Sequence, residues 1–196
     1  MNQIINNEKI ARKKSKIIPR LIIISGVIVF IVLLSILVFN FVIKNSEHKA
    51  SITDLQKHWN AYDYESVYNL SNDILIENPF NNTALTYHGY SAFYLAVSQI
   101  DTALSQSYLD EAINNMRNAL LNAKHSLIPQ LEYMLGKAYF YKNTITSYYY
   151  ADLAVKYLVS ARKHGYKADD IPEYLGLSYA ALGQTMESIS AFTEAL

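Results

Sequence analysis

A recurring interval constrains the fold of this chain more than any other feature of its sequence. Three glycines lie within apolar segments of helical periodicity, and each follows the preceding amphipathic segment at nearly the same distance. The intervals are 22 residues for Val67–Gly89, 24 for Ala112–Gly136 and 22 for Ala154–Gly176. A nearly constant step of this kind predicts helical units that stack on one another, with a small residue where two helices approach closely.

The same pattern predicts four helix–turn–helix units within residues 51–196. The first unit opens at Ser51 in a sequence that resembles a capping box, and it ends before Pro79 because proline disfavours helical backbone in the residue before it. We expect Gly165 to form a left-handed C-cap at the end of the third unit. Asp169 and Asp170 precede the fourth unit and are interpreted as helix caps rather than as a metal-binding pair.

The two middle units are longer than the last one. The intervals within units are 23 residues for Gly89–Ala112, 18 for Gly136–Ala154 and 12 for Gly176–Ser188. Because residues 97–104 contain neither glycine nor proline, we expect them to be helical and the extra residues to lengthen the helices. The middle hairpins should then protrude past their neighbours, and residues 148–150, three consecutive tyrosines, should start a helix in the third.

These residues resemble the tetratricopeptide repeat (TPR) family, whose 34-residue unit is a helix–turn–helix. The match is closest at the end of the chain, in Leu175-Gly176, Tyr179, Gly183, Phe192 and Ala195-Leu196. The first unit departs from the pattern, because Leu55 occupies the position of the small glycine. The resemblance covers residues 51–196 and implies an all-α fold, a TPR-like α-solenoid of about four units that acts in protein–protein interaction.

In this family the first helix of each unit lines a concave groove. By that analogy the candidate partner-binding residues are Trp59, Thr86, Tyr90, Phe93, Tyr133, Lys137, Phe140 and Tyr141. An aromatic groove suits an extended peptide or a partner helix, because tyrosine and tryptophan give contact area at a small entropic cost. Packing between repeats explains any one of these residues equally well.

An uncharged apolar stretch precedes the repeats. The 23 residues of Leu21–Ile43 would span about 34 Å as a helix, enough for a hydrocarbon core of roughly 30 Å. Residues 1–20 carry a net charge of +5, which predicts a cytoplasmic N-terminus and an extracytoplasmic repeat domain joined by a linker at 44–50. A cleaved signal peptide is the rival interpretation, but its apolar region would be shorter, so an uncleaved signal anchor is favoured.

The sequence offers no motif for catalysis, cofactor binding or metal binding. Cysteine is absent, the five histidines are scattered, and none of the phosphate-binding or nucleophile motifs occurs. His88 stands where the family usually has leucine, which favours a half-buried structural role. From Lys44 onward there are 11 basic and 16 acidic residues, and this net charge of −5 argues against nucleic acid as a partner.

Together these features predict a single-pass membrane scaffold for protein or peptide partners. It resembles bacterial inner-membrane anchored repeat proteins, and that resemblance implies a role in envelope assembly or secretion. The alternative is a self-associating structural anchor without a peptide ligand. The last unit finishes on the apolar Ala195-Leu196, whereas solenoids normally end in a polar capping helix. We expect either that the natural chain continues there or that this face docks another molecule.

Overall fold

The computed structural model describes residues 26, 29–38, 51–146 and 149–196. By its internal contacts the chain divides into two units, Met1–Lys49 and Ala50–Leu196. In the first unit, residues 29–38 are helical and exposed, but most of the predicted anchor Leu21–Ile43 lies outside the described residues. Within the part of the chain that is described, no helix combines the length and the apolar character needed to cross a membrane.

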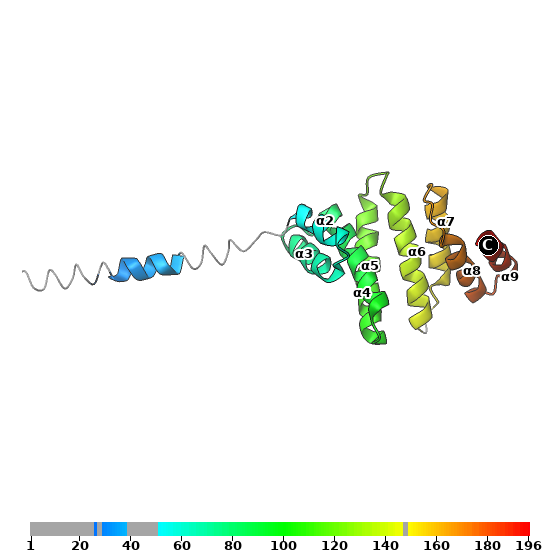
Figure 1. Ribbon diagram of the computed structural model, residues 1–196, viewed down its shortest axis with the longest axis horizontal. Helices are drawn as coiled ribbons and strands as arrows, with labels where there is room; N and C mark the ends of the chain where they lie inside the picture. The colour runs from blue at the N-terminus through cyan, green and yellow to red at the C-terminus, as the bar shows by residue number, and fades with distance from the viewer. Residues whose placement is uncertain (1–25, 27–28, 39–50, 147–148) are drawn as a thin grey trace, which may run out of the picture. The chain divides into compact units, whose positions relative to one another are not determined.

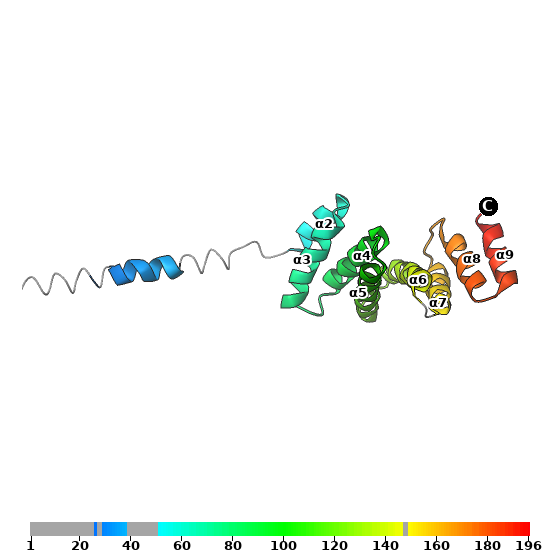
Figure 2. The same ribbon diagram turned by 90° about the horizontal axis from the view of Figure 1, so that it is seen from below.

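The second unit is all-α and consists of four helical hairpins in its described part, as predicted. The hairpins follow one another side by side in chain order (Figures 1 and 2). The helices are α2 (Ile52–Asn60) with α3 (Tyr64–Glu77), α4 (Asn82–Ser98) with α5 (Thr102–Leu121), α6 (Ile128–Ile145) with α7 (Ala151–Lys163), and α8 (Ile171–Ala181) with α9 (Thr185–Glu194).

Several helix boundaries form where the local sequence predicts them. The Ser51 hydroxyl accepts a hydrogen bond from the Asp54 N–H at 3.2 Å, which satisfies one free donor of the first turn of α2. Helix α3 ends at Glu77, two residues before Pro79. After α7, Gly165 has a φ of 90°, the left-handed conformation that glycine adopts without steric penalty.

Two local predictions are wrong, and a third is right only in part. Residues 97–104 are not one helix, because Asp101 accepts from the N–H groups of Ala103 and Leu104 and so caps a new helix, α5. Asp170 occupies the N-cap position of α8, as expected, but its carboxylate makes no cap hydrogen bond and binds Lys137 instead. Tyr149 and Tyr150 do not start α7, which begins at Ala151 with Tyr150 at its N-cap position, and Tyr148 lies outside the described residues.

The middle hairpins are longer, as expected. Helices α4, α5 and α6 have 17, 20 and 18 residues, whereas α2, α8 and α9 have 9, 11 and 10. Helix α7 has only 13 residues, and Asn143 accepts from the N–H groups of Tyr150 and Ala151 at its start.

Close helix contacts occur at the three predicted glycines. A Cβ atom on Gly89 would lie 2.6 Å from Met116 Cγ, and one on Gly136 would lie 2.6 Å from Leu158 Cγ. At Gly176 the obstacle would be the ring of Phe192, at 2.8 Å. These distances are shorter than carbon atoms tolerate, so each glycine allows its hairpin to close.

The first hairpin closes without glycine. Leu55 is fully buried there and forms a small core with Val67, Ile74 and Ala84. A larger core runs through the other three hairpins. Both cores lie wholly within the second unit, which therefore has the internal packing that an independently folding domain requires.

Candidate partner-binding surface

Aromatic side chains form a continuous series across the first helices of the four hairpins. We call this series the aromatic strip. Its members are Trp59 of α2, Tyr87, Tyr90, Phe93 and Tyr94 of α4, Phe140 and Tyr141 of α6, and Tyr174 of α8. The step from α4 to α6 is the Phe93–Tyr141 contact, with 5.7 Å between ring centroids, and the step to α8 is Phe140–Tyr174 at 4.9 Å.

Trp59 is the centre of one end of the strip. Its ring centroid lies 5.5–5.9 Å from those of four tyrosines, Tyr64, Tyr87, Tyr90 and Tyr94. Most of these contacts are edge-to-face, the arrangement that the aromatic quadrupole favours. Trp59 thus joins the first hairpin to the second through rings rather than through charges.

An open groove of about 460 Å³ lies beside Trp59, and we call it the Trp59 groove. It is lined by Gln56, Trp59, Asn60, Thr83, Thr86, Tyr87, Tyr90, Leu127 and Gln130. Its residues come from α2, from α4 and from the start of α6. All nine are uncharged, so this groove presents ring surface, amides and hydroxyls to a ligand.

The other end of the strip carries charge. Lys137 Nζ lies 2.9 Å from Asp170 Oδ2, and the Tyr133 hydroxyl donates to the same carboxylate at 2.7 Å. The ammonium group also lies 4.8 Å from the ring centroid of Tyr174, within cation–π range. Lys137 and Asp170 neutralise each other, and the cluster fastens α6 to the start of α8.

Burial raises the pKa of several tyrosines of this surface. It is the largest cause of the raised pKa of Tyr90, and the same holds for the raised pKa of Tyr174. The pKa of Tyr133 is also raised, first by burial and then by its hydrogen bond to Asp170. These hydroxyls therefore remain neutral at physiological pH and can donate hydrogen bonds.

The candidate residues from the sequence divide into three groups. Trp59, Thr86 and Tyr90 line the Trp59 groove, Phe93, Phe140 and Tyr141 belong to the strip, and Tyr133 and Lys137 belong to the Asp170 cluster. The eight candidate residues also differ in how deeply their side chains are buried. Trp59, Lys137, Phe140 and Tyr141 are half-buried, whereas Thr86, Tyr90, Phe93 and Tyr133 are buried within the chain itself.

Sequence reasoning missed Tyr87, Tyr94 and Tyr174, which complete the strip, and the amides of the groove. A signal for two of them was present. Tyr87, Tyr90 and Tyr94 are spaced i, i+3 and i+7, which places them on one face of a helix. The amides Asn60 and Gln130 carried no such signal, because they are brought together only by stacking of the hairpins.

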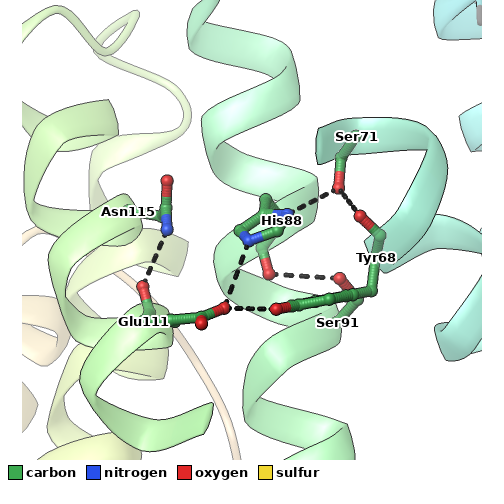
Figure 3. Close-up of polar contacts among 6 residues, drawn as sticks. All are labelled: Tyr68, Ser71, His88, Ser91, Glu111 and Asn115. Carbon is green, nitrogen blue, oxygen red and sulfur yellow. Dashed lines mark hydrogen bonds and ion pairs between the residues drawn. The ribbon is translucent and has the colours of Figure 1, made fainter. Parts of the chain in front are cut away.

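A second polar cluster lies where α3, α4 and α5 meet (Figure 3). The ring of His88 stacks on Tyr68 with 4.4 Å between centroids. Its Nδ1 lies 3.0 Å from Ser71 Oγ and its Nε2 lies 3.6 Å from Glu111 Oε2, a carboxylate that also accepts from the Tyr68 hydroxyl. Burial lowers the pKa of His88, and Glu111 opposes that shift only in part.

Serine, histidine and carboxylate stand here in the order of a nucleophilic triad. The Ser71 side chain is 0% exposed, however, and its hydroxyl donates to the Tyr68 carbonyl at 2.9 Å. His88 is 5% exposed, so a substrate cannot reach either group in this conformation. What the cluster does is fasten the first hairpin to the second. The prediction of a structural His88 is consistent with this position.

Metal binding has no support in the part of the chain that the structure describes. No three His, Cys, Asp or Glu side chains come together there in a way that could hold an ion.

Comparison with solved structures identifies the architecture. No protein-family model matches the chain, and no curated protein is similar to it in sequence. The crystal structure of MamA has a TM-score of 0.54 at 18% identity, covering 72% of this chain and 71% of that one. TTC0263, a thermophilic TPR protein in Thermus thermophilus, has a TM-score of 0.52 at 17% identity, covering 74% of this chain and 71% of that one. The second unit therefore has a TPR-like fold.

Proposed function

We propose that this protein is a non-catalytic scaffold that binds a protein or peptide partner through the aromatic strip. The observation that carries the proposal is the strip itself, a series of ring contacts from Trp59 to Tyr174 along the first helices. Half-buried rings combine contact area with few rotatable bonds, so they lose little entropy when a partner binds. TPR-like neighbours agree with an interaction scaffold as the general class.

We further propose that the scaffold is anchored in the cell membrane with its N-terminus in the cytoplasm, and that it serves envelope assembly or secretion. Support comes from the sequence of Leu21–Ile43 and from the basic residues before it. Residues 29–38 of this stretch form a helix with exposed apolar side chains, which lipid would cover.

Site-specific photo-crosslinking in the native cells tests the binding surface. A benzoylphenylalanine at position 87, in the Trp59 groove, is expected to give discrete adducts with another protein. The same probe at Tyr149, which is 84% exposed on the third hairpin and outside the strip, is the control. Identical adducts from both positions, or none from position 87, would refute binding through the strip.

One observation favours the alternative of a self-associating anchor. Met186 and Ile189 of α9 are exposed at 76% and 56%, although both are large and apolar. If crosslinks from position 87 joined only copies of this chain, and light scattering of residues 50–196 gave a dimer, self-association would replace the scaffold.

Protease protection tests the membrane topology. Protease added to spheroplasts should digest residues 50–196 and leave a short fragment that contains the anchor. Full protection of the repeat domain until the membrane is lysed would show that the topology is the reverse of the proposed one. Release of intact protein by salt washing would show that the chain is not anchored in the membrane.

A further inference from the structure

We propose that the Trp59 groove binds an uncharged, extended peptide segment rich in proline. This rests on the proposed function, because it names the class of segment that the strip receives. The argument uses the charge of the lining, the arrangement of its rings and the hydrogen-bonding groups around them.

The absence of charge distinguishes this groove from two others in the described part of the second unit. Those two lie at the C-terminal hairpin, share Arg162 and Glu194, and include further charged residues such as Lys167, Asp169 and Glu187. The nine residues of the Trp59 groove include no acid and no base. A charged segment would lose hydration there without gaining an opposite charge, so the groove selects a neutral ligand.

The recurring modes of peptide recognition narrow the class further. Recognition of phosphate or carboxylate uses arginine clusters or cationic clamps, which this lining lacks. Addition of a strand needs a sheet edge, and the described residues form none. An amphipathic helix needs an apolar trough, whereas three amides, Gln56, Asn60 and Gln130, lie among the rings here. An aromatic groove with polar neutral neighbours fits a polyproline II segment.

Ring geometry agrees with this ligand. The plane of Trp59 is inclined by 70° to that of Tyr87 and by 42° to that of Tyr90. Rings inclined in this way present both faces and edges to the groove, and a ring face packs well against a compact pyrrolidine ring. One polyproline II turn has three residues over about 9 Å, so successive prolines could contact neighbouring rings.

The polar groups match what a proline segment offers. Such a segment has no internal hydrogen bonds and presents free carbonyl oxygens, while proline has no N–H to satisfy. The exposed side-chain amides of Gln56, Asn60 and Gln130 can donate to these carbonyls. An acceptor-rich ligand therefore suits this groove better than a donor-rich one.

The experiment uses the intrinsic fluorescence of Trp59, which is the only tryptophan in the chain. The full chain is titrated with an acetylated, amidated nonaproline. We expect a saturable change in intensity or wavelength of the Trp59 emission. A glycine–serine peptide of equal length controls for flexible neutral peptides, and maltohexaose controls for carbohydrate, which aromatic grooves can also bind.

Two variants locate the binding. Tyr87→Ala and Asn60→Ala should each weaken nonaproline binding at least tenfold, about 1.4 kcal/mol. Tyr149→Ala, on an exposed tyrosine of the third hairpin, is the matched control and should bind as the unaltered chain does. Circular dichroism and thermal unfolding establish that each variant is folded before its binding is measured.

Three results would overturn the proposal: no saturable response to nonaproline, equal binding of the glycine–serine peptide, or stronger binding of maltohexaose. Equal affinity of Tyr87→Ala and Tyr149→Ala would place the binding elsewhere and overturn it too. Failure here is distinguishable from failure of the proposed function. If nonaproline does not bind but crosslinks at position 87 still trap a partner protein, the scaffold stands and only the ligand class is wrong.

Discussion

Neighbouring hairpins are held together at joints, and two of these joints differ in their electrostatics. One contains a buried neutral histidine and the other contains an ion pair. The joint between the first and second hairpins, which we call the first joint, uses His88, buried against Tyr68 and Ser71. The joint between the third and fourth, the third joint, uses the Lys137–Asp170 ion pair, whose side chains are 16% and 35% exposed. One joint thus depends on a group that must stay neutral, and the other on groups that must stay charged.

The difference between the joints shows that burial determines whether a neutral or a charged contact stabilises them. Charging a buried imidazole costs solvation, which lowers the pKa of His88 even though Glu111 is close. Lys137 and Asp170 keep partial contact with water, so their charges remain solvated while they attract each other. The first joint also lies on α4, the helix that carries Tyr87 and Tyr90 of the Trp59 groove. Weakening it should disturb the groove more than weakening the third joint does.

The largest expected effect comes from His88→Ala. The substitution removes a ring that is only 5% exposed and stacked on Tyr68, and we expect a loss of about 2–3 kcal/mol in the free energy of unfolding. Urea unfolding of residues 50–196 at pH 8 measures it. His88→Leu is the control, since Ser71 keeps its bond to the Tyr68 carbonyl and the leucine fills the space. A loss below about 0.5 kcal/mol, on the scale of ordinary surface substitutions, would show that the first joint does not depend on this ring.

Acid should weaken the first joint. The pKa of His88 is lowered in the folded chain from its usual 6.5, so below that pH the unfolded chain binds a proton that the folded chain does not. The stabilisation is complete above pH 6.5 and is lost as the pH falls below it, by at most about 1.4 kcal/mol per pH unit. The measurement is the unfolding free energy from pH 8 to pH 5 for the unaltered chain and for His88→Leu. Parallel curves would contradict this assignment.

How much of each joint could be predicted from the sequence depends on how far apart in the chain its interacting residues lie. The end of α3 before Pro79 depends on residues close in the chain, and the glycine contacts follow from the regular repeat of the hairpins; both appear where expected. Asp170 was interpreted as a cap because a carboxylate before a helix usually is one. Lys137, 33 residues earlier, competes for it, and a local pattern contains no information about that distance.

The candidate site was predictable to the same extent. The first helices and their aromatic residues follow from helical period and family resemblance, which identified Trp59, Tyr90 and Tyr141. Which rings are buried depends on how tightly the hairpins stack, and this is a property of the whole unit. Phe93 and Tyr133 are buried for that reason, although they share a helix face with exposed residues.

A smaller effect is expected at the third joint. Asp170→Asn removes the ion pair with Lys137 but keeps an acceptor for the Tyr133 hydroxyl, and we expect a loss of about 1 kcal/mol at low salt. The loss should shrink in 1 M salt, where exposed charges are screened. Asp169→Asn, on the exposed neighbour, is the matched control and should change little. A loss that does not depend on salt would mean that packing, not charge, holds the third joint.

The smallest expected effect tests whether charge alone, without burial, stabilises the stack. Arg162 of α7 donates to both carboxylate oxygens of Glu194 of α9, at 2.9 and 2.8 Å, but the two side chains are 45% and 54% exposed. We expect Arg162→Ala to lower the free energy of unfolding by about 0.3 kcal/mol, because water competes for both groups. Thermal unfolding of Arg162→Ala and of Asp170→Asn under the same conditions gives the ratio of their two losses of stability. If Arg162→Ala cost as much as Asp170→Asn, partial burial would not be what strengthens the Lys137–Asp170 pair, and the contrast between the joints would reduce to the buried His88 alone.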